Sequence, residues 1–250
     1  MRERFRVDYT LAGLDVLLHR IGWSVQVPAR RAAERDEDKI ARWREDTWPV
    51  IKAPRRILGA WPCFGDESGQ GLRPPEGRTW GRRGQAPVVT VTGGHGTRVS
   101  LAALIAVRPG HRPRLIYRTH RARRGDKRKG FTETDYARFL DAAHQQLGGP
   151  LVLVWDNLNT HAGGAMRDLI AARDWLTVFR LPPYAHELNP VESVWALLKR
   201  SLANLVKHSL SELTALVKTR LRRMQYRPGL LDAFLARTRL DPTPLYNPRN

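Results

Sequence analysis

Two carboxylates stand where α/β proteins commonly place ligand-binding residues. Asp156 directly follows residues 151–155, a short unbroken apolar run that is typical of a strand buried on both faces. Glu192 lies in the first turn of a predicted helix, for which Asn189 is a suitable N-cap and Pro190 a suitable first residue. In a parallel sheet both carboxylates would lie at the carboxyl edge, where ligand sites collect.

Such a pair of carboxylates, without a cluster of Cys or His, indicates a site for a hard cation. Mg²⁺ prefers oxygen ligands and keeps several waters, so a few carboxylates suffice to hold it. The structural alternative is that Asp156 only ends a strand and that Glu192 favours the positive end of the helix dipole. The spacing of the two residues leaves both interpretations open.

The elements that must position these residues can be predicted from the surrounding pattern. A helix at residues 164–173 and a strand at residues 176–181 lie between the two carboxylates. The helix of Glu192 continues as an apolar stripe, formed by Trp195, Leu198, Leu202 and Leu205. The other predicted elements are strands at residues 88–92, 100–107 and 115–117, a helix at residues 132–147 capped by Thr132 or Thr134, and a helix at residues 209–223.

A longer motif surrounds the two carboxylates. In chain order it consists of Asp156-Asn157 with His161, then Leu181-Pro182-Pro183-Tyr184-Ala185, then Glu187-Leu188-Asn189-Pro190-Val191-Glu192, and finally Trp195. This motif resembles the catalytic core of the DDE transposases of the mariner-like superfamily, in its bacterial insertion-sequence branch. The resemblance implies an α/β fold of the RNase H-like type, with a mixed sheet flanked by helices, and metal-dependent cleavage and transfer of DNA strands.

The resemblance also implies a third acidic residue, Asp66. Residues 56–64 are predicted as the first strand of the core, and they lead into a loop that contains Asp66 and Glu67. As in the family, a Trp-Gly loop follows, here at Trp80. Asp66 is therefore expected to be the first metal ligand, while Glu67 either forms a hydrogen bond nearby or binds the metal itself.

The three acids Asp66, Asp156 and Glu192 are expected to hold two Mg²⁺ ions about 3.5–4 Å apart, and Mn²⁺ is expected to substitute. One ion would activate water or a DNA 3′-hydroxyl, and the other would stabilise the leaving oxygen. Asn157 and His161 would lie beside the metals and orient a water or a phosphate. For His161, a contact at the N-terminus of a helix is an equally good interpretation.

The composition indicates a polyanionic partner. The chain has 250 residues, a formal net charge of +19 and a pI near 11.2, for which nucleic acid is the first candidate. Basic side chains are densest within residues 108–130, where a merely solvated loop is the alternative. Contacts to DNA phosphates, which give affinity but little sequence information, are expected from Arg121, Arg123, Arg124, Lys127, Arg128, Lys129, Lys199 and Arg200.

Other classes of protein are disfavoured by what the sequence lacks. The one cysteine, Cys63, allows neither an internal disulfide nor a Cys-based zinc site, and it suits a reducing cytosolic setting. No apolar run approaches the length of a membrane span, and the first residues lack the core of a signal peptide. We expect a cytoplasmic, nucleoid-associated protein with no membrane partner and no small-molecule cofactor.

Three regions are predicted along the chain. Residues 1–55 are expected to form a partial helix-turn-helix tail and a linker helix, residues 56–226 the RNase H-like catalytic domain, and residues 227–250 a C-terminal tail. Full-length members of the family carry a whole paired helix-turn-helix region, so the chain is expected to be N-terminally truncated. The alternative for residues 1–55 is a small helical appendage that packs on the core.

The expected function is that of a transposase, which cleaves and transfers the DNA strands of an insertion sequence. The resemblance implies a homodimer that acts on double-stranded DNA, at the ends of the element and at a short TA-containing target. One alternative is a transposase-derived DNA-binding protein or truncated remnant without catalytic activity. The other is a different RNase H-like nuclease, acting on RNA–DNA hybrids or junctions. Mn²⁺-dependent nicking separates the first two, and a comparison of hybrid with duplex substrates separates the third.

Overall fold

The computed structural model describes residues 8–26, 32–51, 59–91, 98–121, 130–156 and 163–240. The chain divides into two units, Met1–Glu34 and Arg35–Asn250. The described part of the first unit contains helix α2 (Leu11–Arg20), whose N-cap Thr10 accepts a hydrogen bond from the backbone N–H of Gly13. All the other described helices and strands belong to the second unit.

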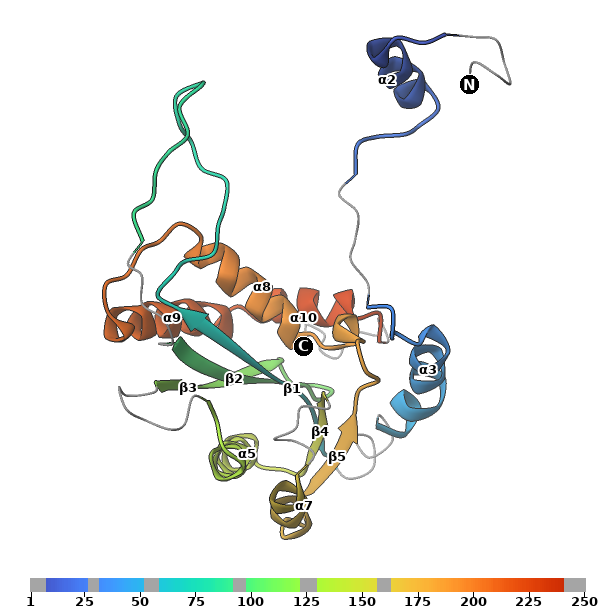
Figure 1. Cartoon of the computed structure of the whole chain (residues 1–250). Coiled ribbons are helices and arrows are strands. Elements are labelled where there is room, and N and C mark those ends of the chain that lie inside the picture. Colours follow the sequence, from blue (N-terminus) through green and yellow to red (C-terminus); the bar gives the residue numbers. More distant parts are fainter. Residues whose placement is uncertain are drawn as a thin grey trace. The chain divides into compact units, whose positions relative to one another are not determined.

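A mixed five-stranded sheet forms the centre of the second unit (Figure 1). Its strands are β1 (Trp61–Gly71), β2 (Arg98–Ala106), β3 (Arg114–Arg121), β4 (Leu151–Trp155) and β5 (Leu176–Arg180), arranged in the order β3-β2-β1-β4-β5. The three strands β1, β2 and β3 pair antiparallel, whereas β4 pairs parallel with both β1 and β5. The predicted mixed sheet is therefore confirmed.

The register of β1 and β4 aligns two of the acidic residues. Phe64 pairs with Val154, so two residues further along each parallel strand Asp66 and Asp156 reach corresponding positions. All five residues of β4 are buried, as its unbroken apolar run predicts. The sheet thus brings together two carboxylates that are far apart in the sequence.

Helices cover both faces of the sheet (Figure 1). The helical elements among the described residues of this unit are α3 (Glu37–Arg42), the π-helical turn η1 (Trp43–Thr47), α5 (Glu133–Leu147), α7 (Gly164–Ala171), the 3₁₀ turn η2 (His186–Leu188), α8 (Val191–Leu202), α9 (Leu210–Gln225) and α10 (Pro228–Arg237). One core cluster joins the sheet to α8, α9, α10 and the tryptophans Trp43 and Trp48. The other cluster packs α5 and α7, through residues such as Phe139 and Met166, on the opposite face.

Local signals in the sequence set several helix boundaries. Thr132 is the N-cap of α5, and it forms a reciprocal capping box with Asp135, because each side chain accepts a hydrogen bond from the other residue's backbone. Ser209 is the N-cap of α9, because its side-chain hydroxyl accepts a hydrogen bond from the backbone N–H of Glu212. Gly148 ends α5 with a left-handed backbone, at φ 64°, which glycine adopts without steric cost.

Two strand predictions require correction. Asp66 and Glu67 do not lie in a loop, because β1 continues through both residues and ends at Gly71, paired with β2 along its whole second half. Residues 88–91 of the predicted strand 88–92 form no strand; Val88 is 89% exposed and the segment lies in a long extension between β1 and β2 (Figure 1). Strand β2, which follows this segment in the chain, pairs instead with β1 and β3.

The C-terminal part also differs from its predicted boundaries. Residues 227–250 are predicted as a tail, yet α10 lies within them and buries Leu231 and Phe234 in the core. Residues 241–250 lie outside the described part. Leu205, predicted on the stripe of α8, follows the end of that helix and is exposed. Within the described residues, no helix has the length and apolar character needed to cross a membrane.

Candidate active site

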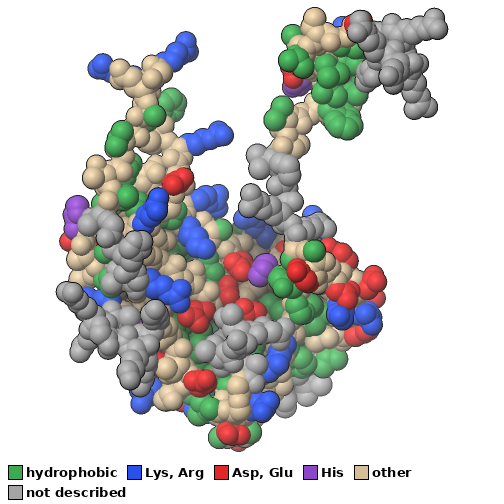
Figure 2. Space-filling model, in the orientation of Figure 1, with side chains coloured by type: hydrophobic (Ala, Val, Ile, Leu, Met, Phe, Trp, Pro, Cys, Tyr) green, Lys and Arg blue, Asp and Glu red, His purple; other side chains and the backbone are tan. Residues whose placement is uncertain are grey.

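A pocket of about 410 Å³ collects the three predicted acidic ligands. Asp66 of β1, Asp156 at the end of β4 and Glu192 of α8 all line it, and residues 181–186 form its other side, here called the site wall. Figure 2 shows acidic side chains gathered in a hollow on this face, with a histidine beside them and Lys and Arg side chains around. The structure therefore brings together side chains that come from three different elements.

Asp66 is held from two directions. The indole Nε1 of Trp195 donates a hydrogen bond to Asp66 Oδ2 at 2.9 Å, and the backbone N–H of Glu67 donates to Oδ1 at 2.9 Å. Burial and, after it, the negative charges of Glu192 and Asp156 raise the pKa of Asp66, while the two hydrogen bonds act against the shift, and the net result is a pKa of about 8. The three carboxylates are thus close enough to repel one another.

Asn189 fixes the start of α8 against β1. Its Oδ1 accepts a hydrogen bond from the backbone N–H of Val191 at 3.1 Å, although α8 begins one residue later than predicted, with Pro190 at the N-cap position. Its Nδ2 also donates to the carbonyl oxygen of Gly65 at 3.0 Å, and the residue is buried. This second bond ties the helix of Glu192 to the residue before Asp66, and nothing in the local sequence pattern indicated it.

His186 lies beside Glu192, and the sequence pattern assigns it no role. His186 Nδ1 lies 3.3 Å from Glu192 Oε1, and both residues line the pocket. The site wall, which ends at His186, is joined to the end of β4, because the backbone N–H of Leu181 donates to the carbonyl of Trp155 at 2.8 Å. The site wall therefore runs from the end of β4, next to Asp156, to His186 beside the carboxylate of Glu192.

Glu67 points away from the pocket. Neighbouring residues of a strand face opposite sides of the sheet, and Glu67 lies on the side of α5. There the hydroxyl of Tyr136 donates a hydrogen bond to Glu67 Oε2 at 2.8 Å. Burial raises the pKa of Tyr136, and the charge of Glu67 adds to this effect. Of the two predicted roles for Glu67, the structure shows the first, a hydrogen bond, which is formed with Tyr136.

The remaining predicted site residues are either outside the described part or away from the pocket. Asn157, His161, Arg123, Arg124, Lys127, Arg128 and Lys129 lie outside the described residues. Arg121 is exposed at the end of β3, and Lys199 and Arg200 are exposed in the last turn of α8. Because a helix rises 1.5 Å per residue, Lys199 lies about 10 Å along α8 from Glu192.

The chemistry of the pocket fits a hard divalent cation. Three carboxylates supply the oxygen ligands that Mg²⁺ prefers, and the repulsion that raises the pKa of Asp66 is what a bound cation would relieve. Among the described residues, no three His, Cys, Asp or Glu side chains are positioned tightly enough to hold one metal ion. The side chains would therefore have to move closer together around the cation.

The fold and the acidic pocket define an RNase H-like α/β protein with carboxylates at the edge of a mixed sheet. A family model described as DDE superfamily endonuclease matches residues 63–216, which is more than half of the chain. The chain belongs to this family, as the sequence resemblance predicts. A second model, described as winged helix-turn helix, matches residues 1–47.

Solved structures of the Mos1 mariner transposase share the fold. The paired end complex with Mg has a TM-score of 0.65, 17% identity, and covers 95% of this chain and 71% of that chain. The paired end complex with Mn has a TM-score of 0.60, and the paired-end complex with the left transposon end has 0.61; both are 17% identical over 95% of this chain and 72% of that chain. No curated protein matches the sequence. The predicted RNase H-like fold is confirmed, whereas the bacterial insertion-sequence branch stays a prediction.

Proposed function

We propose that this protein is a transposase that cleaves and transfers DNA strands in a reaction that depends on divalent cations. The observation that carries the proposal is the pocket in which β1, β4 and α8 bring Asp66, Asp156 and Glu192 together. Its support is membership of the DDE superfamily endonuclease family over residues 63–216. The Mos1 transposase, which shares the fold, has been solved with Mg, with Mn and with a transposon end.

The three carboxylates are the proposed ligands of Mg²⁺, with Mn²⁺ as a substitute. When bound, such cations supply Lewis acidity, which activates an attacking hydroxyl and stabilises the leaving oxygen of a phosphodiester. Trp195 and the backbone N–H of Glu67 fix the orientation of the Asp66 carboxylate. Asn189 holds the helix of Glu192 beside β1, so that the ligands from two elements keep one relative position.

Double-stranded DNA is the proposed partner, at the ends of an insertion sequence and at the target. A net charge of +19 favours binding to the phosphate backbone, and the match of residues 1–47 to a winged helix-turn helix supports a second, N-terminal contact. Arg121, Lys199 and Arg200 are proposed phosphate contacts on the catalytic unit. A homodimer on DNA, the bacterial nucleoid as location and the predicted boundary between residues 1–55 and the catalytic domain belong to the same proposal.

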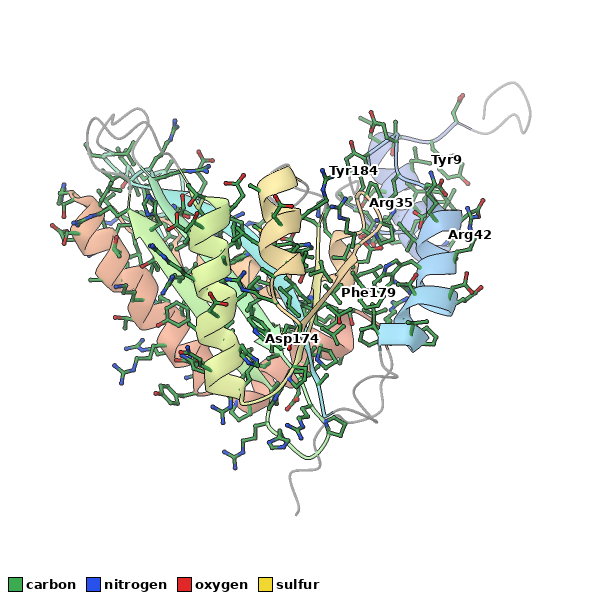
Figure 3. All side chains as sticks on the ribbon, turned by 90° about the horizontal axis from the view of Figure 1, so that it is seen from below. Tyr9, Arg35, Arg42, Asp174, Phe179 and Tyr184 are labelled. Atoms are coloured by element: carbon green, nitrogen blue, oxygen red, sulfur yellow. The ribbon has the colours of Figure 1, made fainter. Side chains whose placement is uncertain are left out.

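A cleavage assay tests the proposal. A labelled duplex that carries the DNA flanking this gene is incubated with the purified protein in Mg²⁺ or Mn²⁺, beside Asp156→Ala and Asp174→Ala. Asp174, labelled in Figure 3, is an exposed carboxylate before β5; because β4 and β5 are parallel, it lies at the opposite end of these strands from Asp156. Cleavage at the element boundary by the wild type and Asp174→Ala, but not by Asp156→Ala, supports the proposal.

The same assay also distinguishes the proposed function from its alternatives. Binding of the duplex without cleavage in either metal would favour a transposase-derived DNA-binding protein that performs no chemistry. Preferential cleavage of an RNA–DNA hybrid would instead indicate a different RNase H-like nuclease.

A further inference from the structure

Arg35 joins the segment before α3 to the site wall. Its Nη1 donates to the carbonyl oxygen of Tyr184 at 2.6 Å and to Glu187 Oε2 at 2.9 Å, and its Nη2 donates to Glu187 Oε1 at 2.6 Å. Its Nε also donates to Glu37 Oε1 at 2.8 Å. These hydrogen bonds hold the pKa of Glu187 below its usual value, so the carboxylate stays charged and paired. A guanidinium group suits this task because its planar fork binds several acceptors at fixed angles.

The backbone that Arg35 contacts is an unusual one. Tyr184 has φ 59°, in the left-handed region that residues with a side chain rarely adopt. The hydrogen bond from Arg35 to its carbonyl therefore supports the wall at its least favourable residue. Figure 3 shows Arg35 and Tyr184 side by side near the start of α3. On either side of Tyr184, the buried residues Leu181 and Ala185 anchor the wall in the core.

The wall leads directly to a carboxylate of the candidate site. His186 follows Ala185, and its Nδ1 lies 3.3 Å from Glu192 Oε1. Glu187, the residue that Arg35 binds through two hydrogen bonds, is the next residue in the chain. A shift of the wall would therefore move His186 against Glu192 and change the shape of the pocket that both residues line.

We propose that Arg35 is a positioning residue of the candidate active site, which holds the site wall in the shape that cleavage of DNA requires. The inference rests on the proposed function. Arg35 is also the first residue of the second unit, directly after the N-terminal unit in the chain. Arg35 also lies within residues 1–47, which match the winged helix-turn helix model, so the positioning contact links this matched segment to the site wall.

The competing interpretation is that Arg35 forms an ordinary surface ion pair, and the chain offers a matched control for it. Arg173 donates to Asp141 from Nε at 2.7 Å and from Nη2 at 2.8 Å, and from Nη1 to the carbonyl of Leu169. The side chains of this pair are 16% and 40% exposed, against 15% and 41% for Arg35 and Glu187. The control pair joins α5 to the residues after α7 and does not line the pocket.

Hydrogen exchange and cleavage kinetics, measured on the full chain, test the proposal with Arg35→Ala, Arg35→Lys and Arg173→Ala. The exchange readout follows the backbone N–H groups of Leu188 and Asn189, which donate to the carbonyls of Ala185 and His186. We expect these groups to exchange at least about tenfold faster in Arg35→Ala than in Arg173→Ala. A tenfold difference corresponds to about 1.4 kcal/mol in the free energy of local opening. Arg35→Lys, which keeps the charge without the fork, should give an intermediate effect.

In the cleavage assay, Arg35→Ala should lower kcat by about 10- to 100-fold, as a small misplacement of the reacting groups does. The KM for the DNA duplex should change much less, and Arg173→Ala should cleave like the wild type. Equal exchange and equal kcat in Arg35→Ala and Arg173→Ala would overturn the proposal. If the wild type itself does not cleave, the proposed function fails, and equal exchange in the two alanine variants would still overturn the role of Arg35 in holding the wall.

Discussion

Asp66 lies in surroundings that oppose its negative charge. Burial and the two neighbouring carboxylates raise its pKa to about 8, from an ordinary value of 3.8. Between these two pH values the folded protein retains a proton that the unfolded chain releases. The free energy of unfolding therefore decreases as the pH rises through this window, as long as no cation is bound.

Asp66→Asn should for this reason stabilise the metal-free protein at pH 8. We expect the Tm to rise by about 2–4 °C or more, which corresponds to about 1 kcal/mol in a domain of this size. Mg²⁺ should raise the Tm of the wild type and leave that of the variant almost unchanged. Thermal unfolding with EDTA or with Mg²⁺, at pH 5 and pH 8, provides the measurement. A variant that is less stable than the wild type at pH 8 in EDTA would contradict this electrostatic explanation.

Glu67 and Asp66 should differ sharply in their effect on cleavage. Glu67→Gln leaves the pocket intact, because the side chain points to Tyr136 on the other face of the sheet. We expect this variant to keep its cleavage rate within about tenfold of the wild type, which corresponds to a change of about 1.4 kcal/mol in the activation free energy. Asp66→Asn should be inactive in the same assay. Equal loss of activity in the two variants would mean that Glu67 is itself a metal ligand.

At the scale of the elements, Asn189 connects α8 to β1. Asn189→Ala leaves the buried carbonyl of Gly65 and the N–H of Val191 without these partners, so we expect a loss of about 1–3 kcal/mol in the free energy of unfolding. Cleavage should fall as well, because the two elements carry different acids. Chemical denaturation and the cleavage assay measure the two effects.

Asn204 provides the control for this prediction. It also bridges two segments, since its side chain bonds both the N–H and the carbonyl of Gly77, but these bonds are exposed. Asn204→Ala should cost less stability than Asn189→Ala and leave cleavage unchanged. If both variants lose stability and activity equally, the position of Asn189 beside Asp66 has no special importance.

Some of the elements could be predicted from the sequence, and others could not. The boundaries of β4 and, to within one residue, the start of α8 were predictable, because the apolar run of residues 151–155 and the pair Asn189-Pro190 are local signals. The length of β1 was not, because residues 65–71 include three glycines and remain a strand only through pairing with β2. The hydrogen bond of Glu67 to Tyr136 joins residues 69 apart in sequence, and no local pattern predicts such a contact.

For the whole molecule, charge should dominate the affinity for DNA. With a net charge of +19, we expect the affinity for a duplex to fall by about 10³ or more between 50 and 200 mM salt. Replacing Lys199 and Arg200 with alanine should reduce the salt slope by about one for each lost phosphate contact. Fluorescence anisotropy with a labelled duplex measures the slope.

Lys39 and Arg42 serve as the comparison, since they are also exposed on a helix and their replacement removes the same charge. An equal change of slope in both double variants would show that only the total charge matters.

The structure predicts that β1, β4 and α8 together form one binding site for divalent cations. A calorimetric titration of the DNA-free protein with Mn²⁺ tests this claim. We expect Asp66→Asn, Asp156→Asn and Glu192→Gln each to weaken binding at least about tenfold, or about 1.4 kcal/mol, while Asp174→Asn binds like the wild type. Unchanged Mn²⁺ affinity in the three site variants would contradict the claim.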